Sequence, residues 1–287
     1  MDHHNIDRWV ASADNENEKT FREAVHTILY AIASSTNLQP RMIMKGGILM
    51  AIRYETGRFT TDIDFSTTTH YRDFAADQAA FLHTFNEAIQ AAVQLLPYQL
   101  DCRLQGTPKV QPRAEGNFQT LRMKVGYARF GTKDHTRLNA GAASKTVQID
   151  YSFNELVHDI DLLGVDEAET VLKAYGELTQ VAEKLRAILQ QVGRERARGQ
   201  DIYDLHHWLI HHPIVDAERK TALLAVLKEK AASREVEATQ SSMEDPEIQT
   251  RARPVYEALA DTISGELPPF DEAFGAVKAF YESLPWT

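Results

Sequence analysis

Residues Met44–Ser66 read MKGGILMAIRYETGRFTTDIDFS and combine two adjacent glycines, a short apolar run and two aspartates around one isoleucine. The residues before the glycines predict a short strand, those after them predict a helix, and FTTDIDFS predicts a second strand. Alternate side chains of a strand point to opposite faces. Asp62 and Asp64 therefore share one face, and Ile63 and Phe65 share the other.

The two aspartates indicate a site for a divalent cation. Residues two apart in a strand have Cα atoms roughly 7 Å apart, so both carboxylates can reach one or two Mg²⁺ ions. Mg²⁺ prefers hard oxygen ligands and keeps waters and substrate phosphates in its shell. Two such ions can clamp an in-line phosphoryl displacement. The alternative is that Asp62 and Asp64 only cap or edge a strand, which is disfavoured because Asp is depleted in strands.

A third carboxylate is expected from another strand. The segment KTVQIDYSF, residues 145–153, alternates apolar and polar side chains and has Asp150 on its polar face. Three carboxylates at close range repel one another, so their convergence predicts a cation. We predict that Asp62, Asp64 and Asp150 are metal ligands, for Mg²⁺ or Mn²⁺.

The glycine pair predicts a phosphate-binding turn next to these acids. Gly46 and Gly47 stand between a strand and a helix, where backbone N–H groups and the helix dipole favour an anion. Lys45 adds a positive charge. A double glycine alone is usually a plain turn. Followed by a helix and an Asp-x-Asp strand, it points more specifically to a nucleotide.

The rest of the chain divides into two patterns. An amphipathic helix is expected around residues 17–35 and another over 73–97, with alternating strands over 118–130 and 145–153 and a polar loop, 131–144, between them. After about residue 163, including the segment 166–176, the pattern is helical or linking. We predict an α/β domain, residues 1–165, followed by an α-helical domain, residues 166–287.

Composition narrows the class of protein. The chain has 287 residues, of which 43% are hydrophobic, and no apolar run long enough for a membrane helix. Its N-terminus does not have the pattern of a secretory signal. A single cysteine, Cys102, excludes an internal disulfide framework and is typical of a reducing compartment. We expect a cytoplasmic protein in which Cys102 is a buried thiol.

Charge is unevenly distributed. The net charge of −10 argues against a general nucleic-acid coat. Residues 103–145, however, carry nine Lys/Arg against two acidic residues. Within residues 184–198, Lys184 and four arginines face only Glu195. Such basic segments are typical of a surface that binds a polyanionic substrate at one place. The alternative is that they are ordinary solvated faces.

Three stretches together resemble one known family. KGGILMAIRYETGRFTTDIDFS (45–66), VQIDYSF (147–153) and VAEKLRAILQQVGRERARGQDIYDLHHWL (181–209) are similar to the AbiEii family of nucleotidyltransferase toxins, which includes the MenT-like toxins. The resemblance spans residues 45 to 210 and implies a polymerase-β-like nucleotidyltransferase palm with a mixed sheet, followed by a helical domain. Residues 215–287 carry no motif that we can match.

The resemblance also implies an activity. Members of this family would transfer an NMP from an NTP to an acceptor hydroxyl, with Mg²⁺, and release pyrophosphate. The implied acceptor is RNA, in particular the tRNA 3′ end, with arrest of translation and growth as the outcome and a cognate antitoxin as partner. The alternatives are a nucleotidyltransferase acting on a small molecule or a protein, a D-x-D glycosyltransferase, and a non-enzymatic interaction protein.

The family pattern implies roles for particular residues. Asp150 would assist the metal or accept the proton of the attacking hydroxyl. Lys184 would reach the triphosphate, and Asp204 would orient Lys184 or the nucleotide. From spacing alone, Lys184 and Asp204 form an ordinary interhelical salt bridge. The predicted catalytic residues are Asp62, Asp64, Asp150, Lys184 and Asp204, and the predicted nucleotide-binding residues are Lys45, Gly46, Gly47, Arg58, Thr60 and Asp201.

Some positions depart from the pattern or allow another interpretation. Gly47 stands where related enzymes often have Ser, Ile48 removes a hydroxyl donor, and Gln200 replaces an Arg, so the details of nucleotide contact differ. His207 and His211 have the i, i+4 spacing of a metal-binding pair. No Glu follows the first histidine, and we expect helix-end histidines rather than zinc ligands.

Overall fold

The computed structural model describes residues 6–111 and 117–286. Its contacts divide the chain into two compact units. The sheet unit comprises Met1–Arg53 and Thr61–Ala174, and the helical unit comprises Tyr54–Thr60 and Tyr175–Thr287. The domains that we predict, 1–165 and 166–287, stay a prediction, since contacts do not show which segments fold alone.

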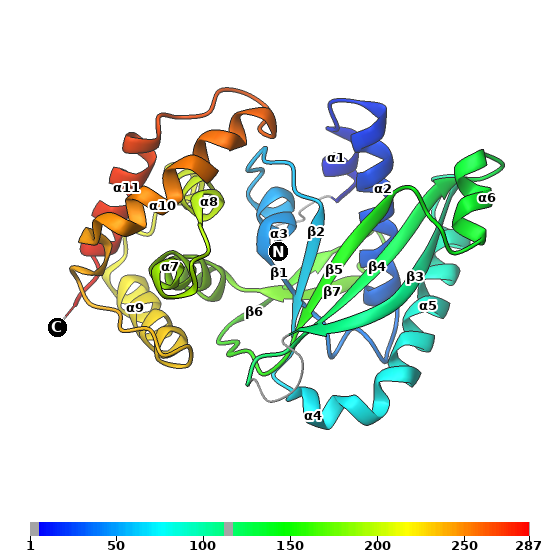
Figure 1. Cartoon of the computed structure of the whole chain (residues 1–287), viewed down its shortest axis with the longest axis horizontal. Helices are drawn as coiled ribbons and strands as arrows, with labels where there is room; N and C mark the ends of the chain where they lie inside the picture. Colours follow the sequence, from blue (N-terminus) through cyan, green and yellow to red (C-terminus); the bar gives the residue numbers. More distant parts are fainter. Residues whose placement is uncertain (1–5, 112–116, 287) are drawn as a thin grey trace. The chain divides into compact units, whose positions relative to one another are not determined.

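The sheet unit is built on a seven-stranded mixed sheet with the order β3-β4-β5-β2-β1-β7-β6 (Figure 1). β2 runs parallel to β5, and β1 parallel to β7, while β1–β2, β3–β4 and β4–β5 are antiparallel. The strands are β1 (Ile43–Lys45), β2 (Asp62–Ser66), β3 (Leu100–Gln111), β4 (Thr120–Arg129), β5 (Thr146–Ser152), β6 (Ile160–Gly164) and β7 (Val171–Tyr175).

Two long helices cover one face of this sheet. α2 (Glu16–Ala33) and α5 (Gln78–Leu95) lie side by side against it (Figure 1). Phe81 of α5 stacks on Tyr151 of β5, with ring centroids 5.5 Å apart, and Ile63 and Phe65 are fully buried. The apolar face of β2 and β5 is therefore the helix-covered face, and Asp62 and its neighbours point the other way. The remaining helices are α1 (Ile6–Ala11), α3 (Gly46–Arg53), α4 (Tyr71–Phe74), η1 (Ala75–Asp77) and α6 (Lys133–Asn139).

The helical unit packs its helices around buried aromatic side chains. α8 contacts α10 and α11, and α7 contacts α9. Trp208 and Tyr256 are completely buried. A Cβ atom at Gly199, the first residue of α8, would lie 2.3 Å from the backbone nitrogen of Tyr256, so only glycine allows this close approach. The helices are α7 (Glu177–Arg194), α8 (Gly199–His211), α9 (Ala217–Ala232), η2 (Ser242–Glu244), α10 (Pro246–Glu257), η3 (Ala258–Asp261) and α11 (Phe270–Glu282).

The segment Tyr54–Thr60 belongs to the helical unit although it stands between α3 and β2 in the sequence. The hydroxyl of Tyr203 donates to the carbonyl of Thr56 at 2.7 Å. Further backbone bonds join the segment to the chain after η3: Phe59 N–H donates to Thr262 O at 2.8 Å, and Ser264 N–H donates to Gly57 O at 3.0 Å. The helical unit thus holds a segment that ends two residues before the Asp-x-Asp strand begins.

The structure confirms the predicted fold class, a mixed sheet with helices followed by a helical C-terminal region. Three local predictions are wrong or incomplete. Residues 171–175 form β7 rather than helix, α6 lies inside the predicted polar loop, and β3 was not predicted. β7 depends on a partner distant in sequence, because Ala174 pairs with Met44 across the β1–β7 ladder. Part of the basic stretch 103–145, including Arg113, lies outside the described residues.

Candidate active site

A row of four charged residues crosses four strands on the uncovered face of the sheet. Lys45 of β1 lies opposite Asp64 of β2, Asp64 beside Asp150 of β5, and Asp150 opposite Arg122 of β4. Residues paired across strands share a face. The sheet therefore places two carboxylates side by side between two cations.

Asp62 occupies a second, parallel row. It pairs with Gln148, which pairs with Lys124 of β4. Asp62 and Asp64 are both partly exposed, whereas Ile63 between them is fully buried. The strand alternation predicted from the sequence is confirmed, and it presents both aspartates on one accessible face.

Asp150 is held by Arg122, a residue that the sequence reasoning missed. The guanidinium donates from Nε to Oδ1 and from a terminal nitrogen to Oδ2, both at 3.0 Å. Hydrogen bonding to Asp150 is the main cause that raises the pKa of Arg122, and the charge of Asp62 contributes. The signal was present in the sequence, since Arg122 lies on the polar face of the alternating strand 118–130.

Lys45 has a partner of its own. Its Nζ lies 3.3 Å from Oε1 of Glu155, and both side chains are buried. Glu155 was not among the predicted residues. The ammonium group predicted to lie close to phosphate is thus bonded to a carboxylate in this structure, at the end of the charged row.

Gly46 approaches Asp64 so closely that no side chain fits between them. Gly46 has a φ of +83°, and a Cβ atom there would lie 2.1 Å from Oδ2 and 2.9 Å from Cγ of Asp64. Gly47, the second residue of α3, is partly exposed. The glycine turn therefore puts bare backbone against the second aspartate of the pair.

Asp62 and Asp64 provide the carboxylate oxygens that a hard divalent cation such as Mg²⁺ prefers. Mg²⁺ needs only one or two protein carboxylates when waters and phosphates complete its shell. Within residues 6–111 and 117–286, no three His, Cys, Asp or Glu side chains are grouped so that they could hold a metal together. Both oxygens of Asp150 already accept bonds from Arg122. Asp62 and Asp64 could therefore hold the ion, and binding of the ion by Asp150 stays a prediction.

The helical unit contains a buried network of charges. Arg58 donates to both oxygens of Asp204 at 2.9 Å. The Nζ of Lys184 donates to Asp201 and to Asp204, each at 2.8 Å. Lys184 and Asp204 are 5% and 0% exposed. Arg58, which we predicted apart from the other three, therefore joins Lys184, Asp201 and Asp204 in one cluster within this unit.

Electrostatics fixes the charged state of this network. Burial alone would raise the pKa of Asp204, but the positive charges of Arg58 and Lys184 more than offset it and lower the pKa to about 2. Burial would likewise lower the pKa of Lys184, but Asp201 and Asp204 raise it. Asp204 is therefore ionised and Lys184 protonated at neutral pH.

The structure groups the predicted residues by unit. The sheet unit brings together Asp62, Asp64, Asp150, Lys45, Gly46 and Gly47, and the helical unit brings together Arg58, Lys184, Asp201 and Asp204. Thr60 lies partly exposed two residues after Arg58. The membership of each group is a finding, while the catalytic roles stay a prediction.

The histidines of α8 bind backbone and one another. The rings of His207 and His211 have centroids 4.5 Å apart, and Nε2 of His207 lies 3.0 Å from the carbonyl of Tyr54. Burial lowers the pKa of His207, and the charge of His211 contributes. His207 thus helps to hold the segment Tyr54–Thr60, which is a structural task.

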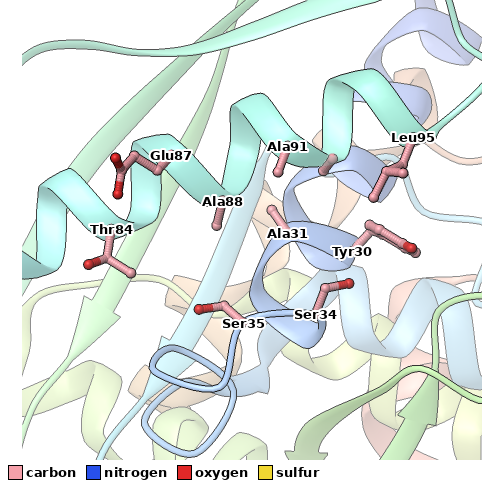
Figure 2. Close-up of a pocket in the computed structure, with 10 residues that line it drawn as sticks. Tyr30, Ala31, Ser34, Ser35, Thr84, Glu87, Ala88, Ala91 and Leu95 are labelled. Carbon is pink, nitrogen blue, oxygen red and sulfur yellow. The ribbon is translucent and has the colours of Figure 1, made fainter.

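A separate pocket of about 320 Å³ lies between α2 and α5 (Figure 2). Alanines of the two helices face each other in its middle, and Tyr30 and Leu95 stand at one end. None of the predicted site residues lines it. Cys102 is completely buried, as predicted, and its burial raises the pKa of the thiol.

The class of protein now follows from comparison with known families. Residues 27–276 match the model of the family described as nucleotidyl transferase AbiEii toxin, type IV toxin–antitoxin system. The chain belongs to this family, as its motifs predict, and is therefore a nucleotidyltransferase that draws on a nucleoside triphosphate. Membership of a toxin–antitoxin system implies an antitoxin partner.

Solved structures show the same fold at low sequence identity. MenT4, a nucleotidyltransferase toxin of Mycobacterium tuberculosis, is 15% identical with a TM-score of 0.55, covering 97% of this chain and 89% of that one. A Helicobacter pylori structure described as a nucleotidyltransferase is 13% identical, with a TM-score of 0.53 over 93% and 96%. JHP933 from the same species is 12% identical, with a TM-score of 0.53 over 94% of each chain.

Curated proteins offer no further guide, because none matches this sequence significantly. Among the helices that the structure describes, none is long and apolar enough to cross a membrane.

Proposed function

We propose that this nucleotidyltransferase toxin uses Mg²⁺ to transfer an NMP from an NTP to an RNA hydroxyl, at the tRNA 3′ end. The observation that carries the proposal is the pair Asp62 and Asp64, which share one accessible face of β2 with Gly46 against the second carboxylate. Transfer of a nucleotide to the 3′ end would block aminoacylation and hence translation. A cognate antitoxin would restrain this activity.

The reaction exchanges a phosphoanhydride bond of the NTP for a phosphoester bond to the acceptor. The acceptor's hydroxyl oxygen bonds to the α-phosphorus, the bond from that phosphorus to the bridging oxygen of pyrophosphate breaks, and the hydroxyl proton leaves. Mg²⁺, when bound, would neutralise phosphate charge and lower the pKa of a coordinated oxygen. Asp62 and Asp64 would hold it, and the turn at Gly46 would receive phosphate on backbone N–H groups.

Asp150 would act from beside the metal ligands. Asp150 neighbours Asp64 in register, and Arg122 fixes both of its oxygens. Each carboxylate oxygen has a second lone pair, so Asp150 can still accept the proton of the attacking hydroxyl. Arg122 would keep this carboxylate oriented and offset the crowding of negative charge on the sheet.

The cluster of the helical unit would serve the nucleotide through Lys184. Lys184 is bonded to two aspartates and Arg58 to one, which leaves both cations ordered before substrate arrives. We assign Lys184 to the triphosphate and Asp204 to orienting Lys184, with Asp201 supporting the same ammonium. Arg58 would hold Thr60 and the start of β2 through its bond to Asp204.

The decisive experiment offers the purified protein each of the four NTPs, labelled at the α-phosphate, with total tRNA and either Mg²⁺, Mn²⁺ or EDTA. Label on tRNA with one or more NTPs, lost in EDTA, is expected. Asp64→Asn should abolish labelling, and Asp73→Asn, an exposed aspartate of α4, should not. Label on the protein itself or on a small acceptor, with none on tRNA, would mean that the acceptor is a protein or a small molecule and not RNA.

A further inference from the structure

Arginines gather where α7 ends. Arg194 is the last residue of α7, and Arg196 and Arg198 follow within the turn that leads to α8. The N–H of Arg196 donates to the carbonyl of Gln191, and the N–H of Arg198 donates to Oε1 of the same glutamine, both at 3.1 Å. The turn is therefore folded back on the last turn of α7, and its position is fixed by backbone bonds.

A fourth arginine joins them from the end of α9. The side chain of Gln190 donates to the carbonyl of Arg234 at 3.4 Å, and α7 packs along α9. We call Arg194, Arg196, Arg198 and Arg234 the arginine turn. All four belong to the helical unit, so their grouping depends on contacts inside that unit.

Three members of the arginine turn, Arg194, Arg196 and Arg198, receive little negative charge from the described part of the chain. Arg194 and Arg196 are exposed and form no ion pair with any described residue, and neither does Glu195 between them. Within the described ranges, Arg198 has only Asp201 as an acidic partner, at 3.6 Å, and Lys184 already binds that carboxylate. The outer two guanidinium groups are therefore available to an external anion.

The interior next to the turn adds more positive charge. Arg186 is 5% exposed and bonds to Glu183 and Gln190, but its Nε has no hydrogen-bond partner among the described residues. Glu183 also accepts from Lys230 at 3.1 Å, so one carboxylate serves two buried cations. The pKa of Arg194 is lowered by burial and by the positive charges of Arg234, Arg186, Arg198 and Arg196, so these cations repel one another.

Helix dipoles do not account for the whole cluster. The C-terminal ends of α7 and α9 each present roughly half a negative charge, which favours one nearby cation. Arg194, Arg196 and Arg198 together exceed that at the end of α7 alone, and the chain as a whole is acidic, with a net charge of −10. Uncompensated like charge held in a fixed turn stabilises nothing in the free protein, which points to a polyanionic ligand.

We infer that the arginine turn binds the phosphodiester backbone of the acceptor RNA, an assignment that rests on the proposed function for the identity of the acceptor. Guanidinium groups bind phosphate oxygens in bidentate fashion, and such contacts position a nucleic acid without reading its sequence. Groups placed along an exposed turn suit successive phosphates of a strand better than the compact triphosphate of one nucleotide.

The test measures binding of fluorescently labelled tRNA by anisotropy between 0.05 and 0.5 M NaCl, that is, over about one decade of salt. The slope is that of the logarithm of the binding constant against the logarithm of the salt concentration. In the double variant Arg194→Gln with Arg196→Gln, the magnitude of this slope should fall by about 1.4–1.8, because each phosphate contact contributes about 0.7–0.9. If the variant and the wild type bind tRNA equally at 1 M salt, these slopes make binding by the variant about 25- to 60-fold weaker at 0.1 M salt.

The matched control removes the same charge elsewhere in the helical unit. Arg251→Gln with Arg253→Gln neutralises two arginines of α10 that are paired with Glu247 and Asp271. This control should bind tRNA with the wild-type slope. Equal slopes for the two double variants would overturn the inference, as would a wild-type protein that binds no tRNA.

Two further measurements separate this inference from the proposed function. Asp64→Asn should bind tRNA like the wild type although it transfers no nucleotide. If the wild type labels no RNA but the arginine-turn variant still loses binding, the proposed acceptor chemistry fails and the inference stands. If the variant instead raises KM for the NTP and leaves tRNA binding unchanged, the turn holds the triphosphate and the inference is wrong.

Discussion

Gly46 and Asp64 are packed backbone against carboxylate: a Cβ atom at position 46 would stand 2.1 Å from Oδ2 and 2.9 Å from Cβ of the aspartate. Glycine is needed at this position for two reasons. The φ of +83° disfavours any L side chain, and the space is already taken by Asp64. The turn and the aspartate pair therefore form one structural unit, although 17 residues of sequence separate the two positions.

Gly46→Ala should inactivate the enzyme by displacing Asp64. The clash involves Cβ and Cγ as well as the carboxylate oxygen, so the whole aspartate side chain must move. Overpacking of this kind costs about 1–3 kcal/mol in addition to the backbone strain. The measurements are the free energy of unfolding in urea and the rate of nucleotide transfer.

Gly131→Ala is the matched control for that prediction. Gly131 has a φ of +75°, and a Cβ atom added there would meet nothing within 4 Å, so alanine adds only the left-handed strain of about 1–2 kcal/mol. Transfer activity should survive in this variant. Equal losses of stability and activity in both variants would mean that contact with Asp64 is unimportant.

Asp64→Asn should separate metal binding from folding. The substitution removes one of two carboxylates that lie side by side and keeps the volume of the side chain, so the metal-free variant should still fold. Mg²⁺ at 100 times its Kd should stabilise the wild type by about 2.7 kcal/mol and leave the variant unchanged. The check is Tm by calorimetry across a Mg²⁺ titration, and an equal Mg²⁺ response in both proteins would refute Asp64 as a ligand.

Arg122→Gln should make the stability of the protein depend more strongly on Mg²⁺. Without the guanidinium, Asp150 loses its partner and adds to the negative charge of Asp62 and Asp64. The pair is partly exposed, so the loss in EDTA should be only about 1 kcal/mol. Saturating Mg²⁺ should narrow the gap to the wild type. A gap that is the same at every Mg²⁺ concentration would contradict an electrostatic role for Arg122.

Stability should fall in acid through Asp204. Its folded-state pKa of about 2 lies below the ordinary value of 3.8, so its contribution is present above about pH 4 and disappears as pH falls toward 2. That difference corresponds to roughly 2 kcal/mol. Asp204→Asn should lose this pH dependence, measured by urea unfolding at pH 6 and pH 3. It should also lose about 3–5 kcal/mol at pH 6, because Arg58 and Lys184 are left without a carboxylate that both of them use.

If the free energy of unfolding falls equally in the wild type and in Asp204→Asn between pH 6 and pH 3, another group is responsible for the acid sensitivity. Asp271→Asn supplies the comparison, since Asp271 binds Arg253 at the surface of the helical unit. Neutralising that aspartate should leave the loss of stability between pH 6 and pH 3 close to that of the wild type, because an ion pair at the surface contributes little.

Local sequence was sufficient for the aspartate pair and the glycine turn. Strand alternation is a property of neighbouring residues, and it alone places Asp62 and Asp64 on one face. The same alternation marked Asp150 as polar-facing. It did not reveal β7 or α6, because Val171–Tyr175 becomes a strand by pairing with β1, and a seven-residue helix capped by Thr132 is too short to show a clear period.

What the sequence determined by itself was therefore the family, the class of chemistry and the face on which the two aspartates of β2 stand. Only the tertiary structure decided their neighbours: Asp150 beside Asp64, Arg122 on Asp150, Glu155 on Lys45. It also assigned Tyr54–Thr60 to the helical unit, through bonds to residues about 150 and 200 positions away. The physical reason is that alternation and turn chemistry act between adjacent residues, whereas register and ion pairing depend on which distant segments fold together.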